Sequence, residues 1–181
     1  MQSIKIPKYL QELHGKRSSL ISLVLVYTNA LLFALFFLYK IQPLDLAVWK
    51  SILLLILVAD IAGGAVANFT TSTRQYYKDN KNLQLPFLLM HIIHPVLLFV
   101  VLPDFLSISI FMALFTLAAV LIVKLFANNQ DLKVIAVFLF GLGASITLLL
   151  PCTGDFLRII PILFFLKLIL GFAVGVFEKK E

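Results

Sequence analysis

Residues 60–95 read DIAGGAVANFTTSTRQYYKDNKNLQLPFLLMHIIHP, and the rest of the chain is organised around this stretch. It contains a carboxylate, Asp60, in one apolar run, then a polar loop, then His91 and His94 in the next apolar run. Ionisable side chains inside a membrane are costly, so they usually face the interior of a helix bundle and mark a functional site. The stretch therefore predicts a membrane-spanning fold and the place of a site within it.

The composition indicates a membrane protein. The 181 residues are 61% hydrophobic and only 13% charged, with a mean hydropathy of +1.04, whereas soluble domains are about 25% charged. The net charge of +6 does not indicate nucleic-acid binding, because most basic residues lie beside apolar runs, where they set membrane orientation. The single cysteine, Cys152, excludes an intramolecular disulfide and a metal site built from several thiolates of one chain.

Six apolar runs predict an all-α, polytopic bundle of six transmembrane helices. They cover residues 20–41, 44–67, 85–102, 105–126, 132–151 and 156–177. Each is long enough to cross a ~30 Å hydrocarbon core as a helix, and no alternating pattern of a membrane barrel is present. The first run is too long for a signal peptide and is interpreted as an uncleaved span. Six short helices enclose little volume, so a homodimer is expected if a substrate crosses the bilayer.

The chain is divided into a basic tail, 1–18, and one transmembrane domain, 19–178. Four apolar residues of the tail recur at helical spacing and predict either an interfacial helix or a frayed tail: Ile6, Tyr9, Leu10 and Leu13. Within the domain, a loop at 68–84 is expected to be cytoplasmic. Its run of four hydroxyl residues, 70–73, could close over the site, contact phospholipid headgroups or simply connect two spans.

The distribution of basic residues predicts that both termini are cytoplasmic, with the plasma membrane as the expected location. One side of the predicted topology carries Lys5, Lys8, Lys16, Arg17, Arg74, Lys78, Lys81, Lys124, Lys133, Lys179 and Lys180. The other side has only Lys40, Lys50 and Arg158. Cytoplasmic loops carry an excess of Lys and Arg.

Asp60 and the two histidines are expected at matching depth. Asp60 lies ~10 Å, His91 ~9 Å and His94 ~14 Å from the cytoplasmic ends of their spans, at 1.5 Å per residue. The two spans are consecutive and antiparallel, so the three side chains are predicted to share one polar cavity.

Small residues follow Asp60 at helical spacing. Gly63, Gly64, Ala67 and Asn68 are predicted on its face of the helix, where they would let a neighbouring backbone come close. Either this face lines a working site, with Asn68 as a further binding group, or the glycines merely make a tight helix crossing.

The histidine pair has three interpretations. At i,i+3 spacing, His91 and His94 share a face and could bind a divalent metal such as zinc, with Asp60 as third ligand. They could instead titrate or donate hydrogen bonds, or be satisfied core residues. Pro95 lacks an N–H and leaves the carbonyl of His91 without its helical partner, so that this oxygen could bind a cation, a substrate or a water.

Lys167 is predicted to pair with Asp60. It lies near the middle of the sixth span, too deep to reach the membrane surface easily, and a buried ammonium requires a counter-ion. Asp60 is the only acid in the interior of any span, since Asp45 lies at the very start of the second one.

The arrangement of Asp60, His91 and His94 on neighbouring spans partly resembles the intramembrane zinc amide hydrolases of the alkaline ceramidase type. The third histidine of that pattern and its serine context are absent here. If all three groups bound metal, no other buried carboxylate would remain as general base.

Three functions are compatible with these patterns. The leading one is a small protein that binds or translocates a cation, proton or small polar solute through Asp60 and the histidines. The second is a metal-dependent intramembrane enzyme acting on lipid. The third is a membrane assembly or signalling subunit whose polar groups only fix helix contacts.

Overall fold

Six helical segments in the described part of the chain are long and apolar enough to cross a membrane, as the sequence predicts. The computed structural model describes residues 3–152 and 154–178. The spans are α2 (Leu20–Lys40), α3 (Val48–Ala67), α5 with α6 (Gln84–His91, Ile93–Val101), α7 (Leu106–Leu125), α8 (Leu132–Leu149), and α9, η6 and α10 in sequence (Ile159–Phe165, Leu166–Val174, Gly175–Phe177). The all-α bundle of a multi-pass integral membrane protein is confirmed.

Short connections make successive spans antiparallel. Three of them contain single 3₁₀ turns, η2 (Gln42–Leu44), η4 (Pro103–Phe105) and η5 (Asp155–Arg158). On the other side, α3 and α5 are joined by a nine-residue helix, α4 (Thr71–Asp79), and by η3 (Lys81–Leu83). The region predicted as a loop is therefore mostly helical.

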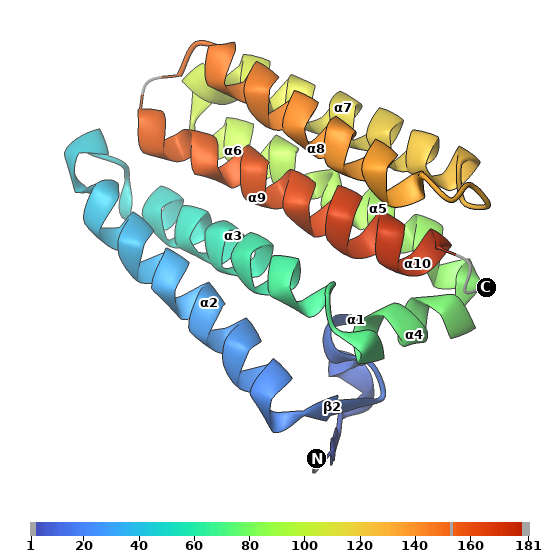
Figure 1. Cartoon of the computed structure of the whole chain (residues 1–181). Helices are drawn as coiled ribbons and strands as arrows, with labels where there is room; N and C mark the ends of the chain where they lie inside the picture. Colours follow the sequence, from blue (N-terminus) through green and yellow to red (C-terminus); the bar gives the residue numbers. More distant parts are fainter. Residues whose placement is uncertain (1–2, 153, 179–181) are drawn as a thin grey trace.

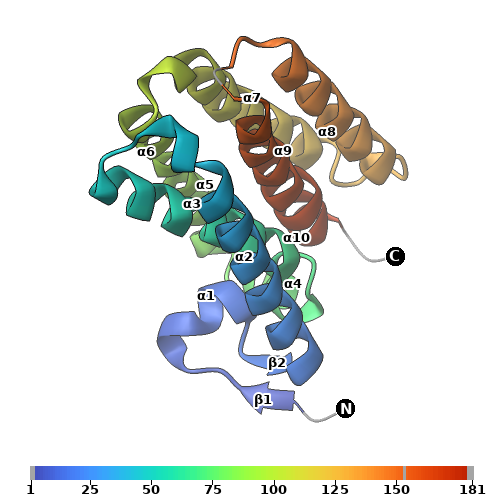
Figure 2. The same cartoon turned by 90° about the vertical axis from the view of Figure 1, so that its left-hand side faces the viewer.

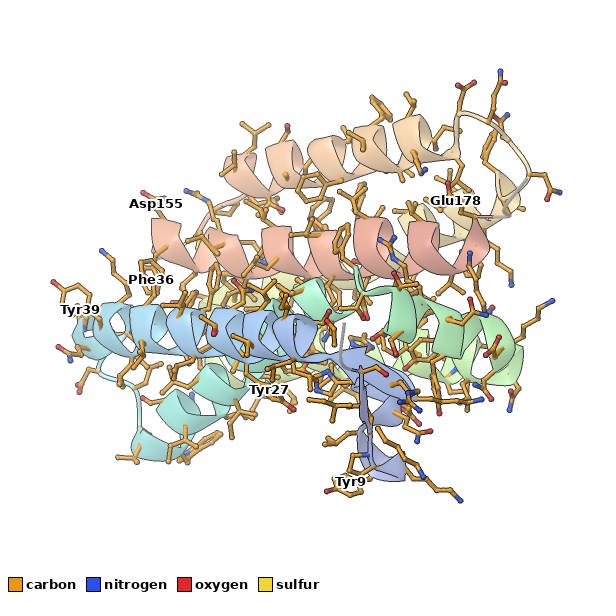
Figure 3. The ribbon with its side chains drawn as sticks, turned by 60° about the horizontal axis from the view of Figure 1, so that its bottom comes forward. Tyr9, Tyr27, Phe36, Tyr39, Asp155 and Glu178 are labelled. Atoms are coloured by element: carbon orange, nitrogen blue, oxygen red, sulfur yellow. The ribbon has the colours of Figure 1, made fainter. Side chains whose placement is uncertain are left out.

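Both ends of the described chain lie at the same end of the bundle (Figure 1). There the Nζ of Lys78 donates to the carbonyl of Glu178 at 2.9 Å, and Lys133 pairs with the Glu178 carboxylate at 2.7 Å. Figure 3 shows Glu178 at the end opposite Tyr39 and Asp155. We call the end that holds the N-terminal segment, α4, the α7–α8 turn and Glu178 the basic end.

The sixth span is the most buried of the six and α2 is the least buried. Figures 1 and 2 show the sixth span between α3 and α8, while α2 runs along α3 at the edge of the bundle. The α2–α3 contact is close at Gly63, which has no side chain: a Cβ added there would lie only 3.1 Å from the Cβ of Ala30. The side-chain amide of Asn29 also donates to the carbonyl of Ala62 at 2.8 Å.

The N-terminal segment is neither a continuous interfacial helix nor a frayed tail. It forms an antiparallel pair of strands, β1 (Ser3–Lys5) and β2 (Arg17–Ser19), which enclose η1 (Lys8–Leu10) and α1 (Gln11–His14). Figure 2 shows these elements below the bundle. Gly15, with φ +71°, ends α1 in a conformation that glycine adopts without steric cost. The chain therefore turns back after one helical turn, and Tyr9 remains exposed at its tip.

The hydroxyl run at the start of α4 holds the N-terminal segment in place. Thr70 caps α4, its hydroxyl accepting from the backbone N–H of Thr73. The hydroxyl of Thr73 donates to the carbonyl of Leu13 at 2.8 Å, and that of Ser72 donates to the carbonyl of Arg17. Two of the four hydroxyl residues thus bind backbone of the N-terminal segment rather than the site around Asp60.

This topology predicts which positions react together with a membrane-impermeant thiol reagent. In a Cys152→Ser background, cysteines at Asn80 and Asn129 should be labelled from one side of the membrane, and cysteines at Gln42 and Asp104 from the other. The measurement is labelling of intact and of inverted vesicles. Labelling of Asn80 and Gln42 from the same side would show that α3 does not cross.

Candidate functional site

Asp60 of α3 and Lys167 of η6 form a direct ion pair inside the bundle. The Lys167 Nζ lies 2.7 Å from Oδ2 of Asp60 and 3.3 Å from the Asp60 backbone carbonyl. The lysine side chain is only 3% exposed, so it cannot reach water at the membrane surface. The sequence predicts this pair because a buried ammonium needs a counter-ion, and Asp60 is the only acid in the interior of a span.

Gly64 makes room for the lysine. A Cβ added there would lie 2.4 Å from Cε and 2.6 Å from Nζ of Lys167, well inside contact distance. The adjacent Gly63 faces α2 instead, so the two glycines serve different helices. The predicted glycine face beside Asp60 is therefore divided between a helix crossing and the ion pair.

His94 is the second partner of Asp60. Its Nε2 lies 2.7 Å from the same Oδ2 that binds Lys167. The third span breaks between α5 and α6, where Pro95 cannot donate to the carbonyl of His91. The Nδ1 of His94 takes that place and donates to the His91 carbonyl at 3.2 Å. The His91 carbonyl oxygen, which receives no hydrogen bond from Pro95, thus fixes the orientation of the His94 ring.

These two contacts define the protons of the pair. A carbonyl oxygen can only accept, so Nδ1 of His94 carries a hydrogen, and the Nε2–Oδ2 hydrogen bond needs a second one. That proton is either on Nε2, which makes an imidazolium–carboxylate pair, or on Oδ2 of Asp60, which makes two neutral groups. In both forms the Asp60–His94–Lys167 cluster holds the same protons and a net charge of +1. Nε2 of His94 and Oδ2 of Asp60 can therefore share one proton.

His91 supports the cluster without bonding to Asp60. Its Nδ1 donates to the carbonyl of Phe87 at 2.6 Å, and the residue is 8% exposed. The ring stacks on His94 with centroids 5.1 Å apart and planes 8° apart, and Phe87 lies 4.2 Å away on the ring centroids. His91 thus sits between His94 and an aromatic side chain.

Asn68 fixes the backbone that carries Lys167. Its side-chain amide donates to the carbonyl of Lys167 at 3.0 Å, and the residue is buried. This segment of the sixth span is π-helical, and such segments are rare and occur frequently at functional sites. Of the predicted site residues, the structure brings Asp60, His94 and Lys167 into direct contact, His91 through stacking and Asn68 through a backbone carbonyl.

The geometry offers little to a metal ion. Among the described residues, no group of three or more His, Cys, Asp and Glu side chains is placed to hold one. Oδ2 of Asp60 already accepts from the ammonium of Lys167, and both Nδ1 atoms of the histidines donate to carbonyls.

The cluster is open on one side. The Asp60 side chain is 46% exposed, whereas those of His94 and Lys167 are 15% and 3% exposed. An exposed carboxylate at this depth requires water or protein rather than lipid around it.

Comparison with protein-family models, with curated proteins and with solved structures finds no match for this chain.

Two features of the site escaped sequence reasoning. The π-helical form of η6 leaves no distinct trace in an apolar run. Phe164 contacts both imidazoles, with its centroid 5.8 Å from His94 and 6.4 Å from His91, but it is one of 17 phenylalanines. Nothing in the sequence separates it from the lipid-facing ones.

Gly64→Ala should destabilise the protein, by about 1–3 kcal/mol as for other overpacked sites, because the new methyl group displaces Lys167 from Asp60. The matched control is Gly141→Ala in α8, where an added Cβ meets nothing within 4 Å and should stabilise the helix by roughly 0.5–1 kcal/mol. Thermal melts in detergent measure both. Equal melting temperatures for the two variants would contradict the close packing at Gly64.

Lys167→Met should lower the melting temperature more than the double change with Asp60→Asn does. The single change leaves a carboxylate without its main partner, at a cost of about 1–3 kcal/mol, and the double change removes that charge as well. Lys124→Met, the same substitution at an exposed position, should have little effect. Strictly additive effects of the two substitutions would show that the groups are independent.

Proposed function

We propose that this chain is a small multi-pass membrane protein that binds a proton at the Asp60–His94 pair and uses it to move protons, or a small polar solute together with a proton, across the membrane. The observation that carries the proposal is that both nitrogens of the His94 ring are hydrogen-bonded, Nδ1 to the His91 carbonyl and Nε2 to the Asp60 carboxylate. This arrangement requires a proton that either residue can hold.

The charge of the cluster favours a proton over a metal cation. Two basic side chains surround one carboxylate, so a divalent ion would have to displace the Lys167 ammonium or meet its repulsion at about the contact distance of an ion pair. A proton needs neither, because it moves between two atoms already 2.7 Å apart. The metal-dependent lipid enzyme is correspondingly less well supported.

The small void beside His91, which stacks on His94, is also compatible with a proton. This void, lined by Thr116, Phe164 and Leu168 among others, has a volume of about 10 Å³. That is room for about one water molecule. Proton transfer through hydrogen-bonded groups and single waters needs no larger passage, whereas a hydrated ion does.

The proposed orientation places both termini in the cytoplasm and the protein in the plasma membrane. It rests on the excess of Lys and Arg at the basic end. Asp60 lies two helical turns from that end of α3, so the cluster would exchange protons with the cytoplasmic side first. From there, the Asp60–His94 pair would hold the proton until it leaves toward the other side.

Asp60→Asn and His94→Gln should each lower proton flux about tenfold or more, because neither variant retains the shared proton. The measurement is acidification of liposomes that contain the purified protein and a trapped pH-sensitive dye, after an imposed pH step. Asp104→Asn is the matched control, since Asp104 is exposed in the α6–α7 turn.

The proposal would be contradicted if vesicles that contain the wild-type protein were no more permeable to protons than protein-free vesicles, both with and without added polar solutes. A folded Asp60→Asn variant with normal flux would contradict it as well. Either result would favour a role in assembly, in which the cluster only joins three spans.

A further inference from the structure

A pocket of about 550 Å³, with polar and apolar lining, lies at the basic end, apart from the Asp60 cluster. Its walls come from two segments distant in sequence, residues 16–22 and residues 70–79. The hydrogen bond from Ser72 to the carbonyl of Arg17 joins these walls. The proton-binding role proposed above makes no use of this pocket.

The lining is suited to an anion. It contains the cations Lys16 and Arg17 and a single carboxylate, Asp79, which accepts from the side chain of Gln75 at 2.7 Å. The remaining polar lining consists mainly of hydroxyl groups, from Ser18, Ser19, Ser22, Thr70, Thr71 and Ser72. Three of these hydroxyls already donate within the protein, Ser19 to Ser22, Thr70 to the carbonyl of Ala67 and Ser72 to the carbonyl of Arg17, and the Arg17 guanidinium donates to Ser3. The hydroxyls of Ser18, Ser22 and Thr71, the Lys16 ammonium and the remaining N–H groups of Arg17 are the donors that phosphate oxygens could accept from.

Ser18 points to an absent partner. It lines the pocket and is only 3% exposed, and its hydroxyl makes no hydrogen bond to a described residue. This hydroxyl is therefore free to donate to an acceptor in the pocket.

Two helices begin at the pocket wall. α2 starts after its cap Ser19, and α4 starts after its cap Thr70. The first N–H groups of a helix have no intrahelical acceptor and carry the positive end of its dipole. Both helix ends therefore add to the attraction that Lys16 and Arg17 exert on an anion.

The pocket adjoins the lipid-facing surface of α2. Leu20, Ile21 and Leu25 are exposed apolar residues that follow directly on the pocket lining. A molecule with a phosphate headgroup and acyl chains could place its phosphate in the pocket and its chains along α2. A free phosphate would use only the polar part.

We propose that this pocket binds the phosphate of an anionic phospholipid headgroup, which then bridges the N-terminal segment and α4. The chemistry is shared with inorganic phosphate, and the position beside the apolar surface of α2 selects the lipid.

The test uses the full-length protein in detergent, with thermal melts over a concentration series of short-chain phosphatidic acid, short-chain phosphatidylcholine or inorganic phosphate. Phosphatidic acid should raise the melting temperature and give an apparent dissociation constant. Lys16→Gln with Arg17→Gln should weaken that binding about tenfold or more. Lys5→Gln with Lys8→Gln removes the same charge from exposed positions of the same segment and should weaken it far less.

A further variant, Thr71→Asp, keeps the test decisive if the double variant does not fold. Asp in the first turn of a helix stabilises it, but here it would repel a phosphate, so binding should fall while the ligand-free melting temperature does not. An equal shift with inorganic phosphate would support the phosphate site and overturn the lipid as its source. Equal shifts with phosphatidylcholine, equal losses in the two double variants, or no shift at all would overturn the proposal.

Discussion

The carboxylate of Asp60 must be neutralised within the membrane, and the packing of three spans depends on how this is done. Lys167 comes from the sixth span and His94 from the third, and both bind the same Asp60 oxygen. Between helices in lipid the hydrophobic effect offers no driving force, so close packing and polar contacts set their register. The cluster therefore does for α3, α6 and η6 what a buried apolar core does in a soluble domain.

The two partners of Asp60 come from spans that depart from regular α-helix. The third span breaks near Pro95, which cannot donate to the His91 carbonyl, so that the His94 ring donates to it instead. The sixth span becomes π-helical around Lys167. Neither departure is an isolated defect, since each is bonded to the cluster or to its immediate support. Asn68 holds the π segment through the Lys167 carbonyl. Backbone irregularity in a membrane is tolerated where it is buried in protein and its polar groups find other partners.

The sequence was sufficient for the six spans and for the pairing of Lys167 with Asp60, because both follow from the cost of polar groups in lipid. It was not sufficient to separate the roles of His91 and His94. Their i,i+3 spacing implies a shared face, but only one imidazole reaches Asp60. Nor could spacing show that Gly63 and Gly64 face different helices, since that depends on where α2 and η6 lie. The strands of the N-terminal segment have three residues each, too few to show an alternating pattern.

The position of Lys167 relative to Asp60 is fixed from several sides by contacts that leave no room for a methyl group. A Cβ on Gly171 would lie 2.8 Å from the Cβ of Asn68, and one on Gly175 would lie 2.4 Å from Nε of Arg74. Arg74 in turn donates to the carbonyl of Asn68 at 3.0 Å. The corner between α3 and α4 is thus packed against successive turns of the sixth span, and Gly64 completes the row beside the lysine itself. Because small-to-large changes in packed regions force backbone shifts, these glycines act as a set. They determine how far apart α3 and the sixth span lie, and so whether the ammonium and the carboxylate can meet at 2.7 Å.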